Sequence, residues 1–475
     1  MAEAKTTHDC PDCAKLRKRV EELEARYTEL ESALAKAKKN SSNSSKPPSS
    51  DITDPPKPKK KPGRPKKRKR GGQPGHARHT RPLFGEDQLD ATFEYRDKLC
   101  PCCGETLVDA DAEPKKFQQI DLADQPVTIE EHRRVAQTCP DCGELHFPQL
   151  PELPQAGLVG PRLTALVGWL KGVCHMSFSS IRKYFRDVIR IPVSRGLLTK
   201  LVTKVSQSLK DPYHELLEQL SKEALLNVDE TGHKENGKRL WTWCFRAAAY
   251  TVFKIDPSRA SDVLVEVLGE EFDGLLGCDY FSAYRKYMRL NENVALQFCM
   301  AHLIRDVKFL CDHPDAENRD YGERVLTLLR KLFATIHRRD EYASETTFRQ
   351  ALERVRNDLC WEVGMETPST REAANLAERF YQHCESYFRF ISDPRIDPTN
   401  NVAEQAIRFV AIHRRLTQGT RGESGRRWFE RICTVAVTCE QQGRSAFAFL
   451  STAVANLFLG APAPSLLSPP APDTS

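Results

Sequence analysis

Three carboxylates stand where they could hold a pair of divalent ions. Asp229 follows the apolar run 225–228 and Asp279 follows the apolar run 275–278, while Glu404 lies in a later segment with helical spacing. Two ions held roughly 4 Å apart by such oxygens stabilise both the attacking and the leaving oxygen of an in-line displacement at phosphorus. These residues therefore predict a phosphoryl-transfer site in which Asp229, Asp279 and Glu404 bind two Mg²⁺ ions, since Mg²⁺ favours carboxylate and water ligands.

Two neighbouring features have simpler interpretations. A carboxylate in the first turn of a helix is favoured by the helix dipole alone, so only the two aspartates make a catalytic role for Glu404 the better interpretation. Glu230 directly follows Asp229, and successive side chains of a strand point to opposite faces. We therefore expect Glu230 to lie outside the metal site.

The segment after residue 223 contains the elements that must position these acids. We expect strands at 224–229, 239–247, 250–256, 274–279 and 295–299, and helices at 260–269, 281–288 and from about 301. Three consecutive strands followed by strand–helix alternation are the order of a ribonuclease-H-like α/β core. In that order the first and fourth strands are neighbours, which would bring Asp229 and Asp279 together.

Helix starts and an insertion complete this core. Ser258 or Ser261 is expected to cap the helix at 260–269, and Thr399 or Asn400 the helix that carries Glu404. Residues 303–395 have no strand pattern and are predicted to form an all-α insertion.

Four cysteines have the spacing of a structural zinc site. Cys100 and Cys103 form one Cys-x-x-Cys pair, and Cys139 and Cys142 form another, each pair being followed by glycine. Two such pairs predict four thiolate ligands arranged tetrahedrally around Zn²⁺, with no open position for a substrate. Cys102 is a spare thiol that could compete. A second group, His8, Cys10 and Cys13, lacks a fourth ligand and is not expected to bind metal within one chain.

The amino-terminal region predicts self-association and DNA binding. Apolar residues at alternating spacings of four and three over 15–39 predict a coiled coil more strongly than a helix packed on the body. Residues 40–56 are rich in Ser, Asn and Pro and are expected to be disordered. Between Lys57 and Arg70 there are ten basic residues and no acidic one. This block partly matches an AT-hook, but a generic phosphate-binding tail is the safer interpretation. Its candidate DNA contacts are Arg64, Lys66, Lys67, Arg68, Lys69 and Arg70.

Residues 160–210 have the pattern of three helices, the last of which Ser194 could cap. A helix-turn-helix with Lys200 and Lys204 facing phosphates and a plain helical packing unit are equally supported, because this motif is weakly marked in sequence.

Length and composition indicate a soluble globular protein of three or four units, and the predicted strands and helices make its fold class multidomain α+β. The chain has 475 residues, 40% hydrophobic and 29% charged, with a net charge of +6. It begins Met-Ala-Glu-Ala-Lys, without a secretory signal, so the cysteines are expected in a reducing compartment. The uncharged stretch 445–471 is interrupted by Ser, Thr, Asn, Gly and Pro, which favours a buried helix and a loose tail over a membrane span. The expected segments are a coiled-coil helix (1–40), a disordered basic linker (41–84), a zinc-binding domain (85–152), a helix-turn-helix-like region (153–222), the first part of the catalytic core (223–310), an all-α insertion (311–395), the carboxy-terminal core helices (396–458) and a disordered tail (459–475).

Five segments together resemble one known family. They are Val228–Thr231, Asp256–Ala260, Gly277–Tyr284, Cys299–Arg305 and Asn400–Arg408. With the zinc-type cysteines and the amino-terminal heptads, the chain resembles over nearly its whole length the insertion-sequence family IS66, bacterial transposases with an Asp-Asp-Glu active site. One departure is Cys299-Met300, where an aromatic residue is usual before Ala-His.

The resemblance implies a DNA transposase that performs Mg²⁺-dependent strand cleavage and 3′-end transfer. His302 and Arg305 are candidates for contacts with the scissile phosphate or flanking DNA, although a fixed core role for His302 is equally supported. Arg408 and Arg415 are candidates for backbone phosphates. The expected partners are the terminal inverted repeats and target DNA, a second copy through the coiled coil, and accessory proteins of the element. The expected location is the bacterial cytoplasm, at the nucleoid.

Other functions remain open. A metal-dependent nuclease or resolvase on the same fold would use the same acids without joining DNA ends. A zinc-ribbon DNA-binding regulator derived from a transposase would have an inactive site, and a dimerisation scaffold would explain the heptads but not the acids.

Overall fold

The computed structural model describes residues 11–39, 83–99, 101–106, 116–120, 122–123, 126–142, 144–150 and 157–467. The chain divides into two compact units, one formed by Met1–Lys57 with His132–Ser475 and the other by Pro58–Glu131. The boundary between them falls inside the segment predicted to bind zinc, and the predicted domain limits remain predictions. The basic block, Cys100, His8 and Cys10 lie outside the described residues, as does the side chain of Cys13.

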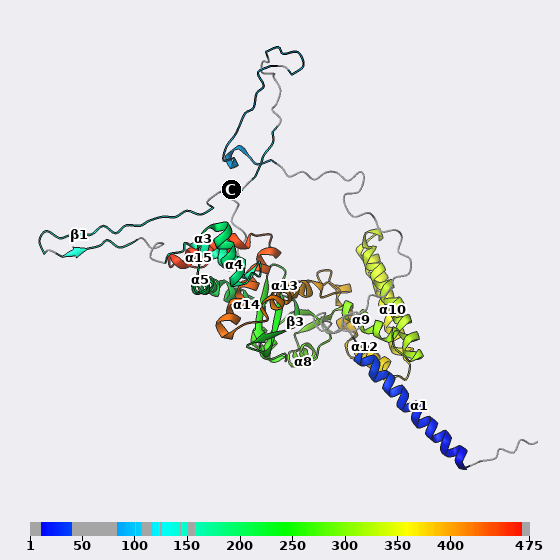
Figure 1. Cartoon of the computed structure of the whole chain (residues 1–475). Helices are drawn as coiled ribbons and strands as arrows, with labels where there is room; N and C mark the ends of the chain where they lie inside the picture. The colour runs from blue at the N-terminus through cyan, green and yellow to red at the C-terminus, as the bar shows by residue number, and fades with distance from the viewer. Residues whose placement is uncertain are drawn as a thin grey trace, which may run out of the picture. The chain divides into compact units, whose positions relative to one another are not determined.

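A five-stranded mixed sheet forms the centre of the larger unit (Figure 1). Its spatial order is β5-β4-β3-β6-β7, with β3 antiparallel to β4, β4 antiparallel to β5, and β3, β6 and β7 parallel. The strands are β3 (Leu225–Glu235), β4 (Lys238–Arg246), β5 (Thr251–Asp256), β6 (Leu275–Cys278) and β7 (Ala295–Phe298). The prediction that the first and fourth strands of this segment are neighbours is confirmed.

β3 is longer than the sequence predicted. Asp229 was expected to end the first strand, but β3 continues for six residues beyond it, to Glu235. The extension pairs in register with β4 through a two-residue turn at Asn236 and Gly237, whose φ angles are 48° and 82°. An Asn-Gly turn of this kind matches the twist of antiparallel strands, so it holds the hairpin together past Asp229. Asp279 does follow the last residue of β6.

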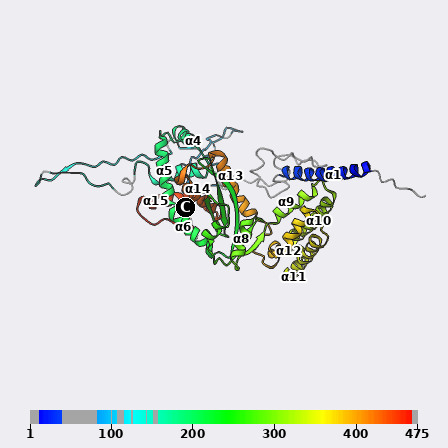
Figure 2. The same ribbon diagram turned by 90° about the horizontal axis from the view of Figure 1, so that it is seen from below.

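The two faces of β3 are covered by different helices, which Figure 2 shows from below. Asn227 and Thr231 bond to side chains of α13 (Asn401–Thr417) or of its preceding residue. Glu230, on the alternate face, bonds to Tyr284 of α8 (Ser282–Leu290). Asp229 shares the face of Asn227 and Thr231 because side chains alternate along a strand. The face toward α13 is therefore the one that presents Asp229.

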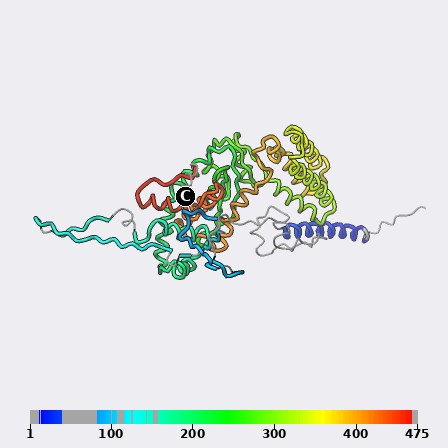
Figure 3. Tube along the Cα trace, turned by 90° about the horizontal axis from the view of Figure 1, so that it is seen from above, coloured from blue at the N-terminus to red at the C-terminus, as the bar shows by residue number. Residues whose placement is uncertain are grey.

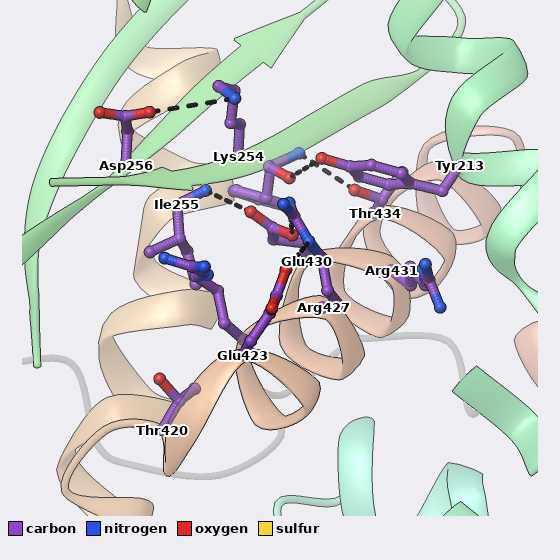
Figure 4. Close-up of polar contacts among 12 residues, drawn as sticks. Tyr213, Lys254, Ile255, Asp256, Thr420, Glu423, Arg427, Glu430, Arg431 and Thr434 are labelled. Carbon is purple, nitrogen blue, oxygen red and sulfur yellow. Dashed lines mark hydrogen bonds and ion pairs between the residues drawn. The ribbon is translucent and has the colours of Figure 1, made fainter. Parts of the chain in front are cut away.

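β5 lies at an edge of the sheet, and its free backbone N–H groups donate to side chains of α14 (Gly422–Gln441). Ile255 N donates to Glu430 Oε1 at 2.7 Å, and Phe253 N donates to Thr434 Oγ1 at 3.0 Å (Figure 4). Thr251 N continues the series to Thr438 Oγ1 at 3.1 Å. Four helical residues rise about 6 Å and two strand residues about 6.6 Å, so alternate strand amides meet every fourth helical side chain. Covering an edge in this way prevents strand pairing with another chain.

Helices pack beyond both edges of the sheet, as the tube view shows (Figure 3). Beyond β5 lie α3 (Pro161–Gly172), α5 (Arg195–Ser208), α6 (Lys210–Gln219) and α15 (Ala446–Phe458). The helix α4 (Phe178–Tyr184) continues as a π-helical turn to Ile189 and precedes α5. Ser194 accepts a hydrogen bond from Leu197 N, which confirms the predicted cap. Lys204, a candidate phosphate contact, lies over the Phe458 ring at 4.7 Å.

The predicted all-α stretch 303–395 is helical in the described structure. It comprises most of α9 (Met300–Cys311) and all of α10 (Ala316–His337), α11 (Glu345–Met365) and α12 (Arg371–Ser392). α12 packs on β7, so this bundle lies beyond the other edge of the sheet. α7 (Asp262–Leu268) has Ser261 at its N-cap position without a side-chain cap, and Ser258 Oγ bonds to Ala260 N instead. The prediction that one of these serines caps the helix is therefore wrong.

The predicted amino-terminal helix is present as α1 (Pro11–Ala37). Near its end it reaches the insertion, where Lys36 Nζ lies 2.8 Å from Glu372 Oε1. Its heptad residues Leu16, Val20, Leu23, Tyr27, Leu30 and Leu34 are each half or more exposed. Within the described residues, no helix combines the length and apolar character needed to traverse a lipid bilayer.

Residues 83–150 contain little regular structure where they are described. The strands β1 (Gln137–Thr138) and β2 (Leu145–His146) pair antiparallel, and an isolated bridge joins Leu99 to Thr106. Each pairing closes a short loop around one predicted cysteine pair. None of the described side chains in this range is buried.

Candidate functional site

Asp229 lies in β3, where its Oδ1 accepts a hydrogen bond of 2.9 Å from Glu230 N. Burial raises the pKa of this carboxyl well above its usual range, and the charges of Glu230, Asp279 and Glu404 raise it further. Like charges raise the pKa of a carboxyl only when they are close. Asp279 and Glu404 are therefore close enough to Asp229 for their charges to act on it.

Asp279 occupies the position directly after β6, where Oδ1 accepts a 2.9 Å hydrogen bond from Phe281 N. Burial, followed by the charge of Glu230, raises the pKa of Asp279 to about 7, although the Phe281 N–H and Arg259 oppose the shift. A carboxyl with this pKa is partly protonated near neutrality. A bound cation would stabilise its ionised form and so lower its pKa.

Glu404 lies in the first turn of α13 and meets two residues of α9. Arg305 Nη2 donates to Glu404 Oε1 at 2.8 Å, and His302 Nε2 lies 3.7 Å from the same oxygen. Burial lowers the pKa of His302 to about 4, and Arg305 contributes to this shift. His302 is therefore a neutral imidazole near pH 7, and Arg305 is the positive charge that faces Glu404.

Asn400 fixes α13 on the sheet. The prediction that Thr399 or Asn400 caps this helix with its side chain is wrong. The Asn400 side chain instead donates from Nδ2 to Val228 O at 2.8 Å. Asn227 Nδ2 donates to Asn400 Oδ1 at 2.9 Å, and Asn400 N donates to Cys299 Sγ at 3.1 Å. The backbone of Asn400 also begins the helix, since Glu404 N donates to its carbonyl at 3.2 Å. One buried amide thus joins the strand of Asp229 to the helix of Glu404.

Gly277 leaves room for this amide pair. It lies opposite Asn227 in the parallel register and two residues before Asp279. A Cβ at this position would collide with Asn227 Nδ2. The absence of a side chain therefore allows Asn227 to lie across β6 and reach Asn400.

Glu230 lies outside the cluster of three acids, in agreement with its expected orientation. It is buried on the opposite face of β3, where Arg259 Nε donates to Oε1 at 2.9 Å and the Tyr284 hydroxyl donates to Oε2. Arg259 also lies over the Phe281 ring at 3.9 Å. Both carboxylate oxygens of Glu230 are thus bonded on the face away from the acids.

The donor set at the three acids fits a hard divalent cation. It consists of carboxylate oxygens, which Mg²⁺ accepts, and two of the carboxyls have raised pKa values. Arg305 supplies one positive charge, at Glu404. Burial and neighbouring negative charge raise these pKa values, and a bound dication would favour the ionised form of both carboxyls.

The candidate DNA contacts are only partly described. Arg408 and Arg415 are exposed on α13, beyond Glu404 along the helix. Arg414 instead turns inward, where Nη1 donates to Thr231 Oγ1 at 3.2 Å. Arg64, Lys66, Lys67, Arg68, Lys69 and Arg70 lie outside the described residues.

Of the predicted zinc ligands, Cys103, Cys139 and Cys142 are described. Backbone N–H groups of Cys142 and Asp141 point at the sulfur of Cys139 and, with the Cys142 side chain, lower its pKa. Such donors favour the thiolate, the form that binds metal. Cys142, Glu144 and His146 also offer donor atoms within 4.8 Å of one another, so this hairpin has more potential ligands than the cysteine spacing indicated.

The residues that support the acids were not predicted from the sequence. Asn227 appeared only as part of an apolar run, Asn400 only as a potential helix cap, and Arg259 and Tyr284 only inside family-like segments. One signal was available for Asn227: a polar residue in a buried strand requires a partner. Nothing in the sequence showed which residue that partner is.

Comparison with known proteins agrees with this description. The family model described as "Transposase IS66 family" matches residues 156–427, and a family of unknown function (DUF6444) matches residues 3–82. An uncharacterised protein of Sinorhizobium fredii, y4qI, is 25% identical over 308 residues, which cover 59% of this chain and 56% of that protein. The chain thus spans about half the length of the curated relative that it matches.

Proposed function

Because the chain belongs to the IS66 family of transposases, we propose that it is an Asp-Asp-Glu transposase that cleaves DNA at the ends of an insertion sequence and joins the 3′ ends to target DNA. The observation that carries this proposal is that the charges of Asp279 and Glu404, two acids from distant parts of the chain, both raise the pKa of Asp229. These residues are proposed as the catalytic carboxylates.

The sheet supports a ribonuclease-H-like assignment for the core. Three antiparallel strands followed by two parallel ones, in the order β5-β4-β3-β6-β7, place β3 and β6 side by side. Asp229, within β3, and Asp279, directly after β6, are then expected to lie close together, and the first turn of α13 would add Glu404. Asp229, Asp279 and Glu404 are proposed to share the two metal ions.

Two Mg²⁺ ions held by these acids would supply a nucleophilic oxygen and stabilise the leaving oxygen of each displacement. The residues of the chain orient that chemistry. Glu230 N and Phe281 N hold one oxygen each of Asp229 and Asp279, which leaves the second oxygen of each free to turn toward the site. Arg305, beside Glu404, is placed to pair with a phosphate that enters.

DNA contacts are proposed along α13 and at the amino terminus. Arg408 and Arg415 are exposed on α13, further along the helix than Glu404, so the backbone of DNA entering the site would pass them. The basic block and the helix-turn-helix-like region would add contacts that are independent of base sequence.

The four cysteines are proposed to bind one structural Zn²⁺. The N–H groups directed at Cys139 support the second pair as a metal-binding turn. Because the described side chains between residues 83 and 150 are not buried, metal ligation would supply the folding free energy that a small apolar core cannot. The exposed heptad face of α1 supports self-association through a coiled coil.

The proposal is tested with the full-length protein and a duplex that carries one terminal repeat of the element. Asp229→Asn and Glu404→Gln are expected to abolish Mg²⁺-dependent cleavage and strand transfer while DNA binding is retained. Glu423→Gln, an exposed carboxylate of α14, is the matched control and should cleave normally. Cleavage by either site variant would remove the two-metal assignment. Cleavage without joining would favour a nuclease, and binding without cleavage by the unaltered protein would favour a regulator.

A further inference from the structure

Beside the three acids lies a second set of potential ligands with a different chemistry. Cys299 directly precedes α9, His302 lies in the first turn of α9, and Glu404 lies in the first turn of α13. Their sulfur, nitrogen and oxygen atoms all lie within 4.8 Å of one another. We propose that Cys299, His302 and Glu404 form a site for a soft divalent metal such as Zn²⁺, and that occupation of this site inhibits the enzyme by withdrawing Glu404.

The spacing of the three donors suits a single ion. Bonds of about 2.0–2.3 Å in tetrahedral geometry put ligand atoms roughly 3.3–3.8 Å apart. His302 Nε2 already lies 3.7 Å from Glu404 Oε1. Small rotations of the Cys299 and Glu404 side chains would complete the set. Three protein ligands leave a fourth position for water, as in zinc sites that are not purely structural.

Cys299 is oriented as a potential metal ligand. Its sulfur accepts a hydrogen bond of 3.1 Å from Asn400 N and stands at the positive end of α9. N–H donors and a helix amino terminus both stabilise a thiolate, and a coordinated thiol is deprotonated. Burial opposes ionisation of the free thiol, so a metal is what would make the thiolate the dominant form.

His302 is available as a ligand. Its Nε2 faces Glu404, and its Nδ1 is buried without a hydrogen-bond partner among the described residues. No second hydrogen bond therefore fixes the proton on one ring nitrogen, and a lone pair can be presented to a metal. Arg305 also holds Glu404, so a metal must share this carboxylate with a guanidinium, which will weaken its binding.

Ligand chemistry separates this site from the Mg²⁺ site. Thiolate and imidazole select Zn²⁺ and similar ions, whereas Mg²⁺ takes oxygen ligands. Glu404 is common to both sets, so occupation of one excludes full assembly of the other. The inhibitory part of the inference rests on the proposed function, because it requires Glu404 to act in catalysis; metal binding at the site does not.

Binding is tested with Co²⁺ as an optical probe in the full-length protein. The four predicted zinc cysteines will also bind Co²⁺, so the readout is the difference in thiolate-to-cobalt absorption between the unaltered protein and Cys299→Ser. We expect about one fewer Co²⁺ per chain in Cys299→Ser and no loss in Cys311→Ser, a cysteine at the other end of α9. His302→Gln, which keeps Cys299, should also weaken the added absorption. Equal spectra and stoichiometry for Cys299→Ser and the unaltered protein, with both folded by circular dichroism, would overturn the site.

Inhibition is tested by titrating Zn²⁺ into the cleavage reaction at fixed Mg²⁺, with each variant compared with its own zinc-free rate. Loss of a residue that only supports a metal ligand typically lowers metal affinity about 10–100-fold. Loss of a ligand itself should therefore raise the half-inhibitory Zn²⁺ concentration at least about tenfold. Unchanged sensitivity in Cys299→Ser would end the inhibitory proposal. The unaltered protein could bind more Co²⁺ than Cys299→Ser and yet show no Mg²⁺-dependent cleavage. That result would contradict the proposed function but would still support the metal site.

Discussion

The side-chain amide of Asn400 donates a hydrogen bond of 2.8 Å to the backbone carbonyl of Val228, the residue directly before Asp229. The same residue begins the helix of Glu404 and accepts a bond from Asn227. Two of the three acids are therefore held in register by one buried side chain.

Asn400→Ala is expected to weaken metal binding at the acids more than it weakens the fold. Supporting partners of metal ligands typically contribute 10–100-fold in affinity, so the Mn²⁺ dissociation constant, measured by electron paramagnetic resonance, should rise by roughly this factor. Asp229→Asn defines the background from other sites. Asn291→Ala is the matched control, because Asn291 is also buried and bonds to backbone, but in the turn before β7. Equal losses of affinity in both variants would show only general damage.

Gly277 and Asn227 should behave as a coupled pair. Gly277→Ala alone puts a methyl group against Asn227 Nδ2 and should reduce both Mn²⁺ affinity and stability. In an Asn227→Ala background the obstacle is gone, so the second substitution should add little. Residues in contact give interaction free energies of about 0.5–3 kcal/mol in such cycles, measurable by urea denaturation. Additive effects would mean that the two residues do not act together.

The buried carboxylate of Glu230 depends on Arg259. Removing one partner of a buried ion pair leaves an uncompensated charge and typically costs about 3–5 kcal/mol; the value here should fall at or below the lower end because Arg259 is 36% exposed and Tyr284 remains. Arg259→Gln should therefore lower the free energy of unfolding clearly, and Glu230→Gln in the same chain should restore part of it. Arg349→Ala breaks an exposed pair on α11 and should cost about 0.5 kcal/mol or less. An Arg259→Gln variant as stable as Arg349→Ala would contradict this role.

Stability without Mg²⁺ should depend on pH through Asp279. Its pKa of about 7 in the folded protein lies above the 3.8 of an unperturbed aspartate, so the proton favours the folded state. This contribution is complete below about pH 4 and is lost as the pH rises to about 7, at up to about 1.4 kcal/mol per pH unit. Denaturation at several pH values should show a shallower decline over this window for Asp279→Asn. Identical slopes for the two proteins would refute the assignment.

The hydrogen bonds between α14 side chains and the edge strand β5 give a prediction that is independent of catalysis. Thr434→Val keeps the shape of the side chain but leaves the Phe253 N–H buried without its acceptor, which costs about 1–3 kcal/mol. Thr452→Val on the exposed face of α15 is the control and should change the free energy of unfolding little. Loss of these hydrogen bonds should also increase aggregation, visible by light scattering, because an open strand edge pairs with other chains. A Thr434→Val variant that matches the control in both measurements would show that these hydrogen bonds are unimportant.

Local patterns were sufficient for most of the secondary structure. The strands, the insertion helices, the amino-terminal helix and the Ser194 cap follow from apolar spacing and capping chemistry, which act within a few residues. The end of β3 was misplaced because its last six residues form no apolar run, and their strand conformation comes from pairing with β4 across the Asn236-Gly237 turn. Such pairing depends on another strand, so the apolar pattern of residues 230–235 alone does not predict it.

The three acids could be selected from the sequence because their residue types and their positions beside apolar runs are local properties. Only the tertiary structure decided what supports them: that Asn400 turns away from its own helix toward Val228, that Gly277 makes room for Asn227, and that Cys299 and His302 stand beside Glu404. These relationships join residues from 50 to 172 positions apart. They are set by packing of the sheet against α13 and α9, which no single segment specifies.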